Sequence, residues 1–456
     1  MTSTANSPMD SAEFSRNPYP TLAALRRSGP VQRVRASEGR TTWIVTGWPE
    51  ARAALADARL SKDTGRYFAD RPSSRNLAPA VSRTMLATDP PDHGRLRRLA
   101  MKAFTPAAVA RIEPRIHEIA QRLAEQMRDG AASRPAVTGP GPATGPGADL
   151  APTDPGPGPA TAPGVDPAPT NPDADPAPTG PGRADLVEEF AAPLPIAVIS
   201  ELLGVPEGDR TAVRHWSHDL FAAAAPDTVD RASHAISDYM TELIAERRAA
   251  PGDDLLSDLI AARDAEDRLT EPELVSLAVL LVVAGHETTT HLIGNGMLVL
   301  LHDDALRARL RADTTLLPAA VEEFLRHDSP VTTATFRYAT VPFTLGGVRI
   351  EAGDVVLVSP GAANRDPARF ADPDAVRPGR AAGHLAFGHG PHHCLGAPLA
   401  RVEARIAFGV LLDRFPGMRP AGTPDDVTWR RTRLMHGPAR LPVVLGPSGT
   451  YSTFHR

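Results

Sequence analysis

The chain has 456 residues, 23% of them charged, and a formal net charge of −5 at pH 7. This near-balance of charge gives no electrostatic basis for binding nucleic acid or an anionic membrane surface. The only cysteine, Cys394, excludes an intrachain disulfide and therefore a disulfide-stabilised secreted scaffold. Residues 1–30 carry no basic start followed by an apolar run, so we expect no signal peptide and a cytoplasmic location.

Helical periodicity dominates the chain. Between residues 107 and 127, the side chains of Ile112, Ile116, Ile119 and Leu123 fall on one helix face. Further helices are expected at residues 186–203, 207–224, 228–249, 253–264, 271–302, 304–312, 316–327 and 396–413. Strand signals are short, at residues 41–46, 331–338, 343–350 and 355–359. The sequence predicts a mainly α fold with small β-sheets, built as a single large domain over residues 1–456.

A proline-rich segment interrupts this pattern. Fifteen of the 47 prolines lie between Pro135 and Pro181, in a stretch without lysine, arginine or aromatic residues. Such a stretch buries too little apolar surface to offset its chain entropy. We expect a disordered, partly extended insertion at about residues 132–184, for which a proline-rich docking segment is the functional alternative.

The helix expected at residues 271–302 is apolar nearly all round, as a helix at the centre of a large protein is. Its longest apolar run, Leu274–Gly285, is twelve residues, whereas a membrane span needs about 20. Polar residues 286–291 (HETTTH) follow, and buried polar groups are costly unless they are paired or functional. Either the helix surfaces or meets a water-filled cavity there, or Glu287 and Thr288 deliver protons to a reaction cavity.

The lone cysteine lies in an irregular loop made by Gly388, Gly390 and Pro391, directly before another buried helix. Backbone N–H groups at a helix N-terminus stabilise a thiolate. Three interpretations of Cys394 therefore compete. A structural cysteine does not explain the glycine loop, and a zinc site needs histidines that lie too close together to surround one tetrahedral ion, namely His389, His392 and His393. The third interpretation is an axial thiolate ligand of haem iron.

Three motifs resemble those of the cytochrome P450 monooxygenases. Residues 387–396 (FGHGPHHCLG) resemble the haem-binding loop of this family, residues 284–289 (AGHETT) its oxygen-activating helix, and residues 323–326 (EFLR) its Glu-x-x-Arg helix. Their order and spacing agree, and the resemblance extends from about Asp10 to Val444, except for the insertion. It implies a P450-like fold around haem b, and insertion of one atom of dioxygen into an organic substrate.

The resemblance also implies roles for individual residues. Cys394 would be the iron ligand, and the amides of Leu395 and Gly396 would hydrogen-bond its sulfur. Glu287 and Thr288 would position water and relay protons to bound oxygen. The other expected cofactor-binding residues are His93, Arg97, Ala284, Gly285, Arg337, Phe387, Gly388 and His392. Four of these, His93, Arg97, Arg337 and His392, would bind the two haem propionates.

One further group departs from the family pattern. Glu323 and Arg326 are three residues apart on one helix face and can pair. The resemblance implies a third partner, an arginine before the haem loop, which here is Arg380. This arginine is one residue closer to His384 than is usual, and Val376 stands where phenylalanine is common.

Electrons must come from another protein, because the sequence has no Gly-x-Gly-x-x-Gly dinucleotide site and no four-cysteine iron–sulfur pattern. We expect a monomer that receives electrons, ultimately from NAD(P)H, through a ferredoxin and a ferredoxin reductase. Arg95, Arg98 and Lys102 would form a basic docking face for the ferredoxin, or else simply a solvated helix face.

The resemblance implies that the substrate cavity is lined by residues 67–86, by the helices near 210–240, by residues before and after Thr288, by residues 331–336 and by the tail near residues 434–435. These stretches are small and apolar, including the alanines at 222–225. Arginine supplies all but two of the 49 basic residues, which resembles actinobacterial proteins, and residues 330–337 (PVTTATFR) resemble P450s that tailor polyketides and macrolides. We therefore expect hydroxylation or epoxidation of a bulky apolar natural product. The alternatives are a peroxide-driven haem peroxygenase and a non-catalytic haem-binding or sensor protein.

Overall fold

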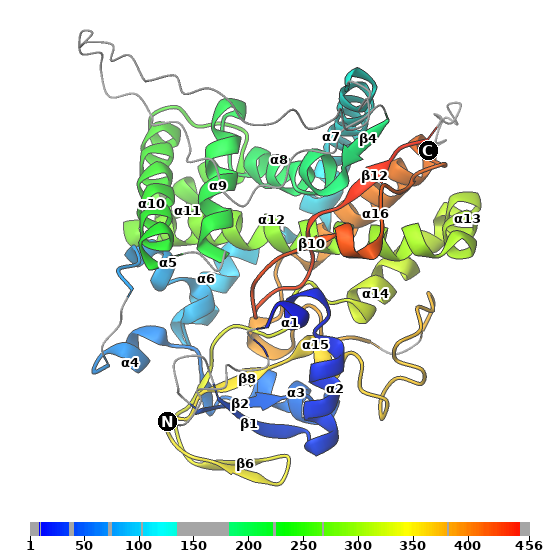
Figure 1. The fold of residues 1–456 in the computed structure, drawn as a ribbon. Helices are drawn as coiled ribbons and strands as arrows, with labels where there is room; N and C mark the ends of the chain where they lie inside the picture. Colours follow the sequence, from blue (N-terminus) through cyan, green and yellow to red (C-terminus); the bar gives the residue numbers. More distant parts are fainter. Residues whose placement is uncertain are drawn as a thin grey trace, which may run out of the picture.

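The computed structural model describes residues 9, 11–35, 41–71, 75–101, 104–134, 182–221, 225–266, 269–380 and 383–446. Most helices lie in the upper part of Figure 1, and the β1-β2-β8 sheet lies in the lower part. The expected mainly α fold with small sheets is confirmed. The alanines at 222–224 lie outside the described residues.

The α-helices have the following bounds: α1 (Ala12–Arg16), α2 (Tyr19–Ser28), α3 (Trp48–Ala56), α4 (Thr64–Phe68), α5 (Pro79–Ser82), α6 (Asp92–Met101), α7 (Pro106–Ser133), α8 (Pro193–Leu202), α9 (Arg210–Phe221), α10 (Pro226–Ala249), α11 (Leu255–Glu266), α12 (Glu271–His302), α13 (Asp304–Ala312), α14 (Leu317–His327), α15 (Pro360–Ala363) and α16 (Ala397–Arg414). Short 3₁₀ or π turns are η2 (Met85–Ala87), η4 (Val187–Ala191), η5 (Glu207–Asp209), η6 (Thr314–Leu316), η7 (Gly390–His392) and η8 (Pro424–Asp426).

The strands are β1 (Val31–Arg35), β2 (Thr41–Val45), β3 (Leu60–Ser61), β4 (Arg183–Asp185), β5 (Tyr338–Ala339), β6 (Phe343–Leu345), β7 (Val348–Ile350), β8 (Val356–Val358), β9 (Arg419–Pro420), β10 (Thr428–Trp429), β11 (Pro438–Arg440) and β12 (Pro442–Val444). In the largest sheets, β2 pairs antiparallel with β1 and parallel with β8, and β12 pairs with β4 and β9. The hairpin β6–β7 turns at Gly346 and Gly347, whose φ angles of 56° and 81° suit a two-residue hairpin turn.

The strand expected at residues 331–338 is wrong except at its end. Only Tyr338 continues into a strand, β5, which pairs with β3. The amides of Thr332 and Thr333 instead both donate to the carbonyl of Leu434, at 2.9 and 3.2 Å, and that of Ala334 donates to Val358. Because these bonds go to two different segments, no regular ladder forms.

The proline-rich insertion begins and ends at one place in the fold. Helix α7 and strand β4 extend slightly into the expected range of 132–184, while residues 135–181 lie outside the described part of the chain. The N–H of Gly182 donates to the carbonyl of Ala131 at 3.0 Å, and Arg134 pairs with Glu189 at 2.8 Å. The core on either side is therefore continuous across the insertion.

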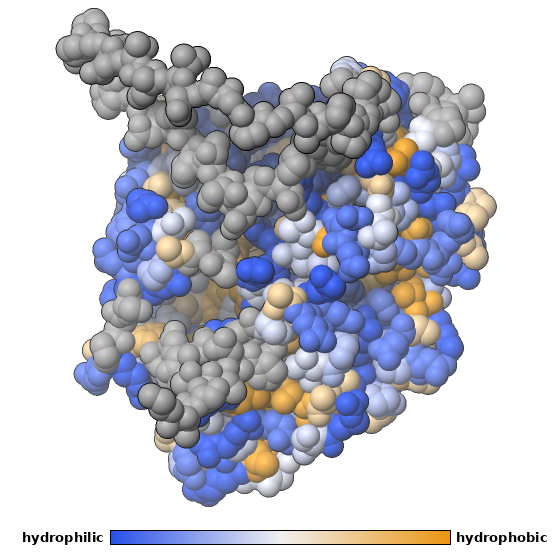
Figure 2. All heavy atoms as spheres, viewed as in Figure 1, coloured by the Kyte–Doolittle hydropathy of each residue, from blue (hydrophilic) through white to orange (hydrophobic). Residues whose placement is uncertain are grey.

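Helix α12 runs through the centre of the helical part, against α5, α8, α10 and α16. By length and composition it could cross a membrane, but 78% of its most apolar window is buried inside the protein, which is typical of a core helix. The described surface in Figure 2 is mostly hydrophilic. Among the described residues, the large hydrophobic side chains that are exposed are Met101 and Val341.

Glu323 and Arg326 of α14 form a buried ion pair, with two N–O distances of 2.8 Å. As expected, Arg380 also binds Glu323, at 2.9 Å. Arg326 is 1% exposed, and its remaining donors reach the carbonyls of Asn364 and Pro373. This pairing therefore ties α14 to the segment that leads into the cysteine loop.

We predict that Arg326→Met lowers the free energy of unfolding by about 3–5 kcal/mol, because it leaves a carboxylate buried without its main partner. The matched control is Arg349→Met, which removes an ion pair to Glu351 that is mostly exposed; it should cost less than about 1 kcal/mol. Denaturant unfolding of both variants measures the difference, and equal losses would contradict this role of Arg326.

Candidate functional site

The loop before α16 holds Cys394 in a defined backbone conformation. Gly388 and Gly390 have φ angles of 74° and 75°, a left-handed conformation that glycine adopts without strain. A Cβ on Gly390 would also lie 2.8 Å from the Cα of Ala56. The amide of Cys394 donates to the carbonyl of Phe387 at 2.9 Å, which closes the loop.

The sulfur of Cys394 lies at the N-terminus of α16. Burial raises the pKa of this thiol, whereas hydrogen bonds from the N–H groups of Gly396 and Ala397 and the charge of Arg97 oppose the rise. This amide pair replaces the expected pair of Leu395 and Gly396. The cysteine is nevertheless exposed to solvent. A thiol that is accessible and yet surrounded by protein faces an internal cavity.

Phe387 is held from outside the loop by charged groups. The guanidinium carbon of Arg401 lies 4.5 Å from the ring centroid of Phe387. Arg401 also pairs with Glu322 at 2.6 Å, and Glu322 lies 3.2 Å from His384. Burial opposes ionisation of Glu322, but its hydrogen bonds to His384 and Arg401 outweigh burial and lower its pKa to about 2.

Four predicted propionate ligands come together on the other side of the loop. The rings of His93 and His392 have centroids 4.0 Å apart, and Arg97 donates to the carbonyl of His393 at 2.7 Å. Burial, with the charges of nearby bases, lowers the pKa of His392 to about 2. Burial alone lowers the pKa of Arg337 to about 10. These shifts show a cluster of bases that is short of negative charge.

A fifth base, Lys62, belongs to this cluster and was missed in the sequence. The register of β3 and β5 pairs Ser61 with Tyr338, which brings Lys62 beside Arg337. Lys62 is 3% exposed, and its Nζ donates to Thr335 Oγ1 at 2.6 Å. Burial and the charge of Arg337 hold the pKa of Lys62 well below its usual value. A single lysine after a two-residue strand gives no sequence signal for this position.

The carboxylate that faces this cluster of five bases is Asp89. Its Oδ1 accepts the backbone N–H of Lys62 at 2.9 Å, and its other oxygen accepts the hydroxyl of Ser61. Asp89 raises the pKa values of Lys62 and His93. Burial and the neighbouring cations lower the same pKa values by more than Asp89 raises them. One carboxylate cannot balance the arginines and the lysine, so the cluster favours an additional anionic group.

Helix α12 exposes a narrow strip at its centre. Leu280, Ala284 and Thr288 are four residues apart and therefore lie on one face; Ala284 is exposed and the other two are half-buried, although most of the helix is buried. The hydroxyl of Thr288 donates to the carbonyl of Ala284 at 3.1 Å. Gly285 lies off this strip, where a Cβ would be 3.3 Å from Ile199 of α8. Ala284 and Thr288 thus face a cavity, while Gly285 allows close helix packing.

Glu287 does not lie on the exposed strip with Thr288. Its carboxylate is buried, bonds to Arg430, and lies 3.3 Å from His286 Nε2 and 3.7 Å from His218 Nδ1. Burial disfavours the charge, but the hydrogen bond with His286 and the charge of Arg430 hold the pKa of Glu287 well below its usual value. The expected pair is therefore split between two faces of one helix.

No three His, Cys, Asp or Glu side chains among the described residues come together in a way that could hold a metal ion. The zinc interpretation of Cys394 and its neighbouring histidines therefore lacks a set of metal ligands among the residues that the structure describes. The same arrangement leaves Cys394 free to act as a single axial ligand.

Known proteins share this sequence and fold over nearly the whole chain. The family model described as Cytochrome P450 matches residues 213–428. The chain is 43% identical over 437 residues to cytochrome P450 monooxygenase PikC from Streptomyces venezuelae, covering 94% of this chain and 92% of PikC. The chain belongs to the cytochrome P450 family.

Two further P450 relatives are informative. Mycinamicin IV hydroxylase/epoxidase from Micromonospora griseorubida is 39% identical over 424 residues, which are 92% of this chain and 94% of that enzyme. The structure of the tirandamycin C-bound P450 monooxygenase TamI matches with a TM-score of 0.78 and 41% identity, over 96% of this chain and 99% of TamI. This P450 is therefore a monooxygenase of the haem-thiolate class.

The residues of this P450 fit a haem. The accessible thiol of Cys394 faces a cavity. Ala284 and Thr288 form an exposed strip on a helix that is otherwise buried, and this exposure also requires a cavity beside them. The group of five bases, of which Lys62, His93 and Arg337 are buried, favours an anionic partner, and haem carries two propionates. Cys394 would hold the iron, while the propionates would lie against the bases, which are Lys62, His93, Arg97, Arg337 and His392.

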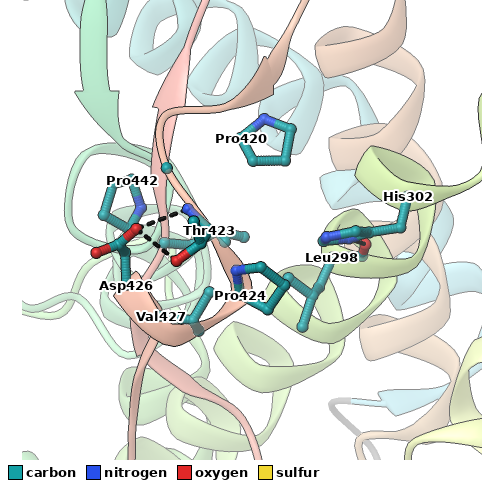
Figure 3. Close-up of a pocket in the computed structure, with 10 residues that line it drawn as sticks. Leu298, His302, Pro420, Thr423, Pro424, Asp426, Val427 and Pro442 are labelled. Atoms are coloured by element: carbon teal, nitrogen blue, oxygen red, sulfur yellow. Dashed lines mark hydrogen bonds between the residues drawn. The ribbon is translucent and has the colours of Figure 1, made fainter.

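A separate hollow lies near the C-terminal end of α12 in this P450 (Figure 3). Leu298, His302, Pro424 and Val427 line it, and Asp426 accepts hydrogen bonds from the backbone and hydroxyl of the neighbouring Thr423. Leu298 is ten residues from Thr288, or about 15 Å along the helix axis. The hollow is therefore distinct from the cavity at Cys394.

We predict that Lys62→Met speeds loss of haem from the P450 by about tenfold, because a charge-assisted hydrogen bond of about 1.5 kcal/mol to a propionate is removed. Transfer of haem to excess apomyoglobin measures the release rate without any turnover. Arg98→Met on the exposed side of α6 is the control and should leave the rate unchanged. Equal rates for Lys62→Met and the unaltered protein would contradict the assignment.

Proposed function

We propose that this monooxygenase hydroxylates or epoxidises a bulky, largely apolar natural product. The single observation that carries the proposal is the thiol of Cys394, which is held by α16 amides and open to an enclosed cavity. Haem bound there supplies the activation of dioxygen and the insertion of one oxygen atom into the substrate.

The chain's own residues would do three things in this reaction. The N–H groups of Gly396 and Ala397 would hydrogen-bond the Cys394 sulfur and favour its thiolate form as the ligand of iron. The five bases orient the cofactor through its propionates. Thr288 holds a hydroxyl in the cavity, where it can bind water and pass a proton to it, and the carboxylate of Glu287 on the adjacent face would relay protons to Thr288.

The described lining of the cavity suits an apolar substrate. Leu280 and Ala284 are apolar, and Phe336 packs with Tyr67 at a ring-centroid distance of 4.8 Å. Val331 forms a bridge to Met435, which joins two segments expected to line the cavity. The descriptions of the two relatives name mycinamicin IV and tirandamycin C. We propose that this P450 acts on a substrate of the same general size and chemistry.

Electrons would come from a ferredoxin and its NAD(P)H-dependent reductase. We propose that the P450 that receives them is a cytoplasmic monomer. Its single haem domain would be interrupted by the insertion at about residues 132–184. Of the three residues expected to form the basic face for the ferredoxin, the structure describes Arg95 and Arg98. Arg95 pairs with Glu273 and Asp92, and Lys102 lies outside the described residues. Arg98 is exposed and remains available for an acidic partner.

The reduced protein should show, on binding carbon monoxide, the strongly red-shifted Soret band of thiolate-ligated haem. Titration with macrolide lactones should then displace iron-bound water and shift the Soret band of the oxidised protein. Cys394→His should give a Soret band typical of histidine ligation. Absence of a Soret band in protein made with ample haem would refute the proposal.

We expect Thr288→Ala to lower the product formed per NAD(P)H by about tenfold or more, because proton delivery contributes about 10²–10⁴-fold in enzymes. NAD(P)H oxidation itself should continue, with hydrogen peroxide released instead of product. Thr288→Ser keeps the hydroxyl and should retain most of the coupling. If Thr288→Ala coupled as well as the unaltered enzyme does, Thr288 would have no part in proton delivery.

A further inference from the structure

The hairpin formed by β10 and β11 has a long connection, residues 430–437. Most hairpin loops have about two to five residues. A longer loop is mobile unless contacts outside the hairpin hold its tip. In Figure 1 this loop extends from β10 toward α1. Its tip, residues 434–436, is bonded to several distant parts of the chain.

The loop crosses α12 close to Thr288. A Cβ on Gly437 would collide with the ring of His291, so the two segments are in close contact. His291 follows Thr288 by three residues, which is about 4.5 Å along the axis and nearly the same helix face. The tip, which directly precedes Gly437, therefore lies at the level of the cavity that Thr288 faces.

The tip is also bonded to residues 330–333. The amide of His436 donates to the carbonyl of the first of these residues at 2.9 Å, and the carbonyl of Leu434 accepts the amides of the last two. The same segment continues to Arg337, one of the five bases. The tip and residues 330–336 therefore form one wall between Thr288 and the bases, on which the side chain of Leu434 is half-buried.

The ring of His436 ties this tip to two other segments. Its Nδ1 lies 2.7 Å from Oδ1 of Asp328, directly after α14, and its Nε2 lies 3.2 Å from the carbonyl oxygen of Arg16 in α1. The ring is 3% exposed and stacks on Trp429, with ring centroids 4.7 Å apart. A carboxylate and a carbonyl only accept hydrogen bonds, so both ring nitrogens of His436 donate. The imidazole is then a cation paired with a carboxylate.

Asp328 is held in place from two further helices. Its Oδ1 accepts the hydroxyl of Tyr19 in α2 at 2.8 Å. Asn295 of α12 donates to the main-chain carbonyls of Asp328 and His436, at 3.3 and 3.0 Å. Burial disfavours the charge of Asp328, but the charge of His436 and its hydrogen bond outweigh burial and lower the pKa of Asp328. A buried ion pair adds little net stability over apolar packing, so its directional bonds are the feature that needs an explanation.

We propose that Asp328 and His436 are positioning residues: their ion pair holds Leu434 and Met435 at the wall of the cavity and so determines how tightly a bulky molecule packs there. The pair acts through the tip and does not itself touch the substrate. The carbonyl of Arg16 makes α1 part of the same arrangement. The inference rests on the proposed monooxygenase function, which assigns the cavity to a bulky substrate.

The first test compares two azoles in the haem-loaded protein by the shift of the Soret band. Clotrimazole binds iron and fills the surrounding space with its triaryl group, whereas imidazole contacts little beyond the iron. His436→Phe keeps a ring beside Trp429 but removes both donors. Its Kd for clotrimazole should rise about tenfold, equivalent to the packing of about two methylene groups, while its Kd for imidazole should stay unchanged. Unchanged clotrimazole affinity would overturn the proposal.

Tyr19→Phe is the matched control, because it removes a hydrogen bond from the same carboxylate without touching the tip. It should lower the thermal midpoint of unfolding by about 2 °C and leave both azole affinities as they are. If Tyr19→Phe weakened clotrimazole binding as much as His436→Phe does, the cluster would act only through general stability, and the positioning role would be refuted.

Asp328→Asn covers the case in which His436→Phe does not retain haem. It keeps an acceptor of the same shape but removes the charge, so the Kd for clotrimazole should rise about threefold relative to that for imidazole. The amides of residues 332, 333 and 436 should also exchange with deuterium about threefold faster, which mass spectrometry measures without any ligand. An unchanged ratio of the azole affinities, or unchanged exchange, would contradict the proposal.

Turnover separates the positioning role from the function on which it rests. With a macrolide lactone that the enzyme oxidises, His436→Phe should raise KM about tenfold and change kcat less than about twofold, because binding common to the ground and transition states is lost. If no macrolide lactone is oxidised while the azole and exchange results hold, the positioning role stands and the substrate assignment fails. Unchanged KM in His436→Phe, with normal azole binding, would refute the positioning role alone.

Discussion

The need to hold a cysteine sulfur that can become a thiolate inside the protein is the constraint on which the rest of this structure depends. An anion away from bulk water is stable only where hydrogen-bond donors and cations replace its hydration. Here the donors are the amides of Gly396 and Ala397, and the cations are Arg97 and Arg401. For these groups to meet the sulfur, α16 must begin directly after the loop, and Gly390 must pass close to Ala56.

The structure contains two charge clusters that differ in their balance. The five bases around Lys62 and Arg337 face one carboxylate, Asp89, so their excess positive charge favours binding of an anionic group. The cluster around Glu287 already pairs its carboxylate with Arg430. It therefore needs no ligand to balance its charge. The first cluster is therefore suited to binding an anionic group, and the second is balanced without one.

Helix α12 connects these features because successive residues on a helix point about 100° apart. Thr288 and Ala284 open onto the cavity, Glu287 turns into the ionic cluster, and Gly285 lies against Ile199. One helix thus presents Thr288 to the cavity and Glu287 to the ion-pair cluster on its adjacent face. Adjacent positions in the chain have different chemistry here because they lie in different surroundings.

Short-range patterns in the sequence determined the helices, the hairpin at Gly346-Gly347, the loop at Cys394 and the pairing of Glu323 with Arg326, since each depends on neighbours a few residues apart. The tertiary structure decided the rest. Lys62 joins the bases through the pairing of β3 with β5, and Arg430 reaches Glu287 across 143 residues of sequence. Residues 331–336 read as a strand but bond to two separate segments. The energy of a buried charge depends on what packs around it, and local spacing does not specify that packing.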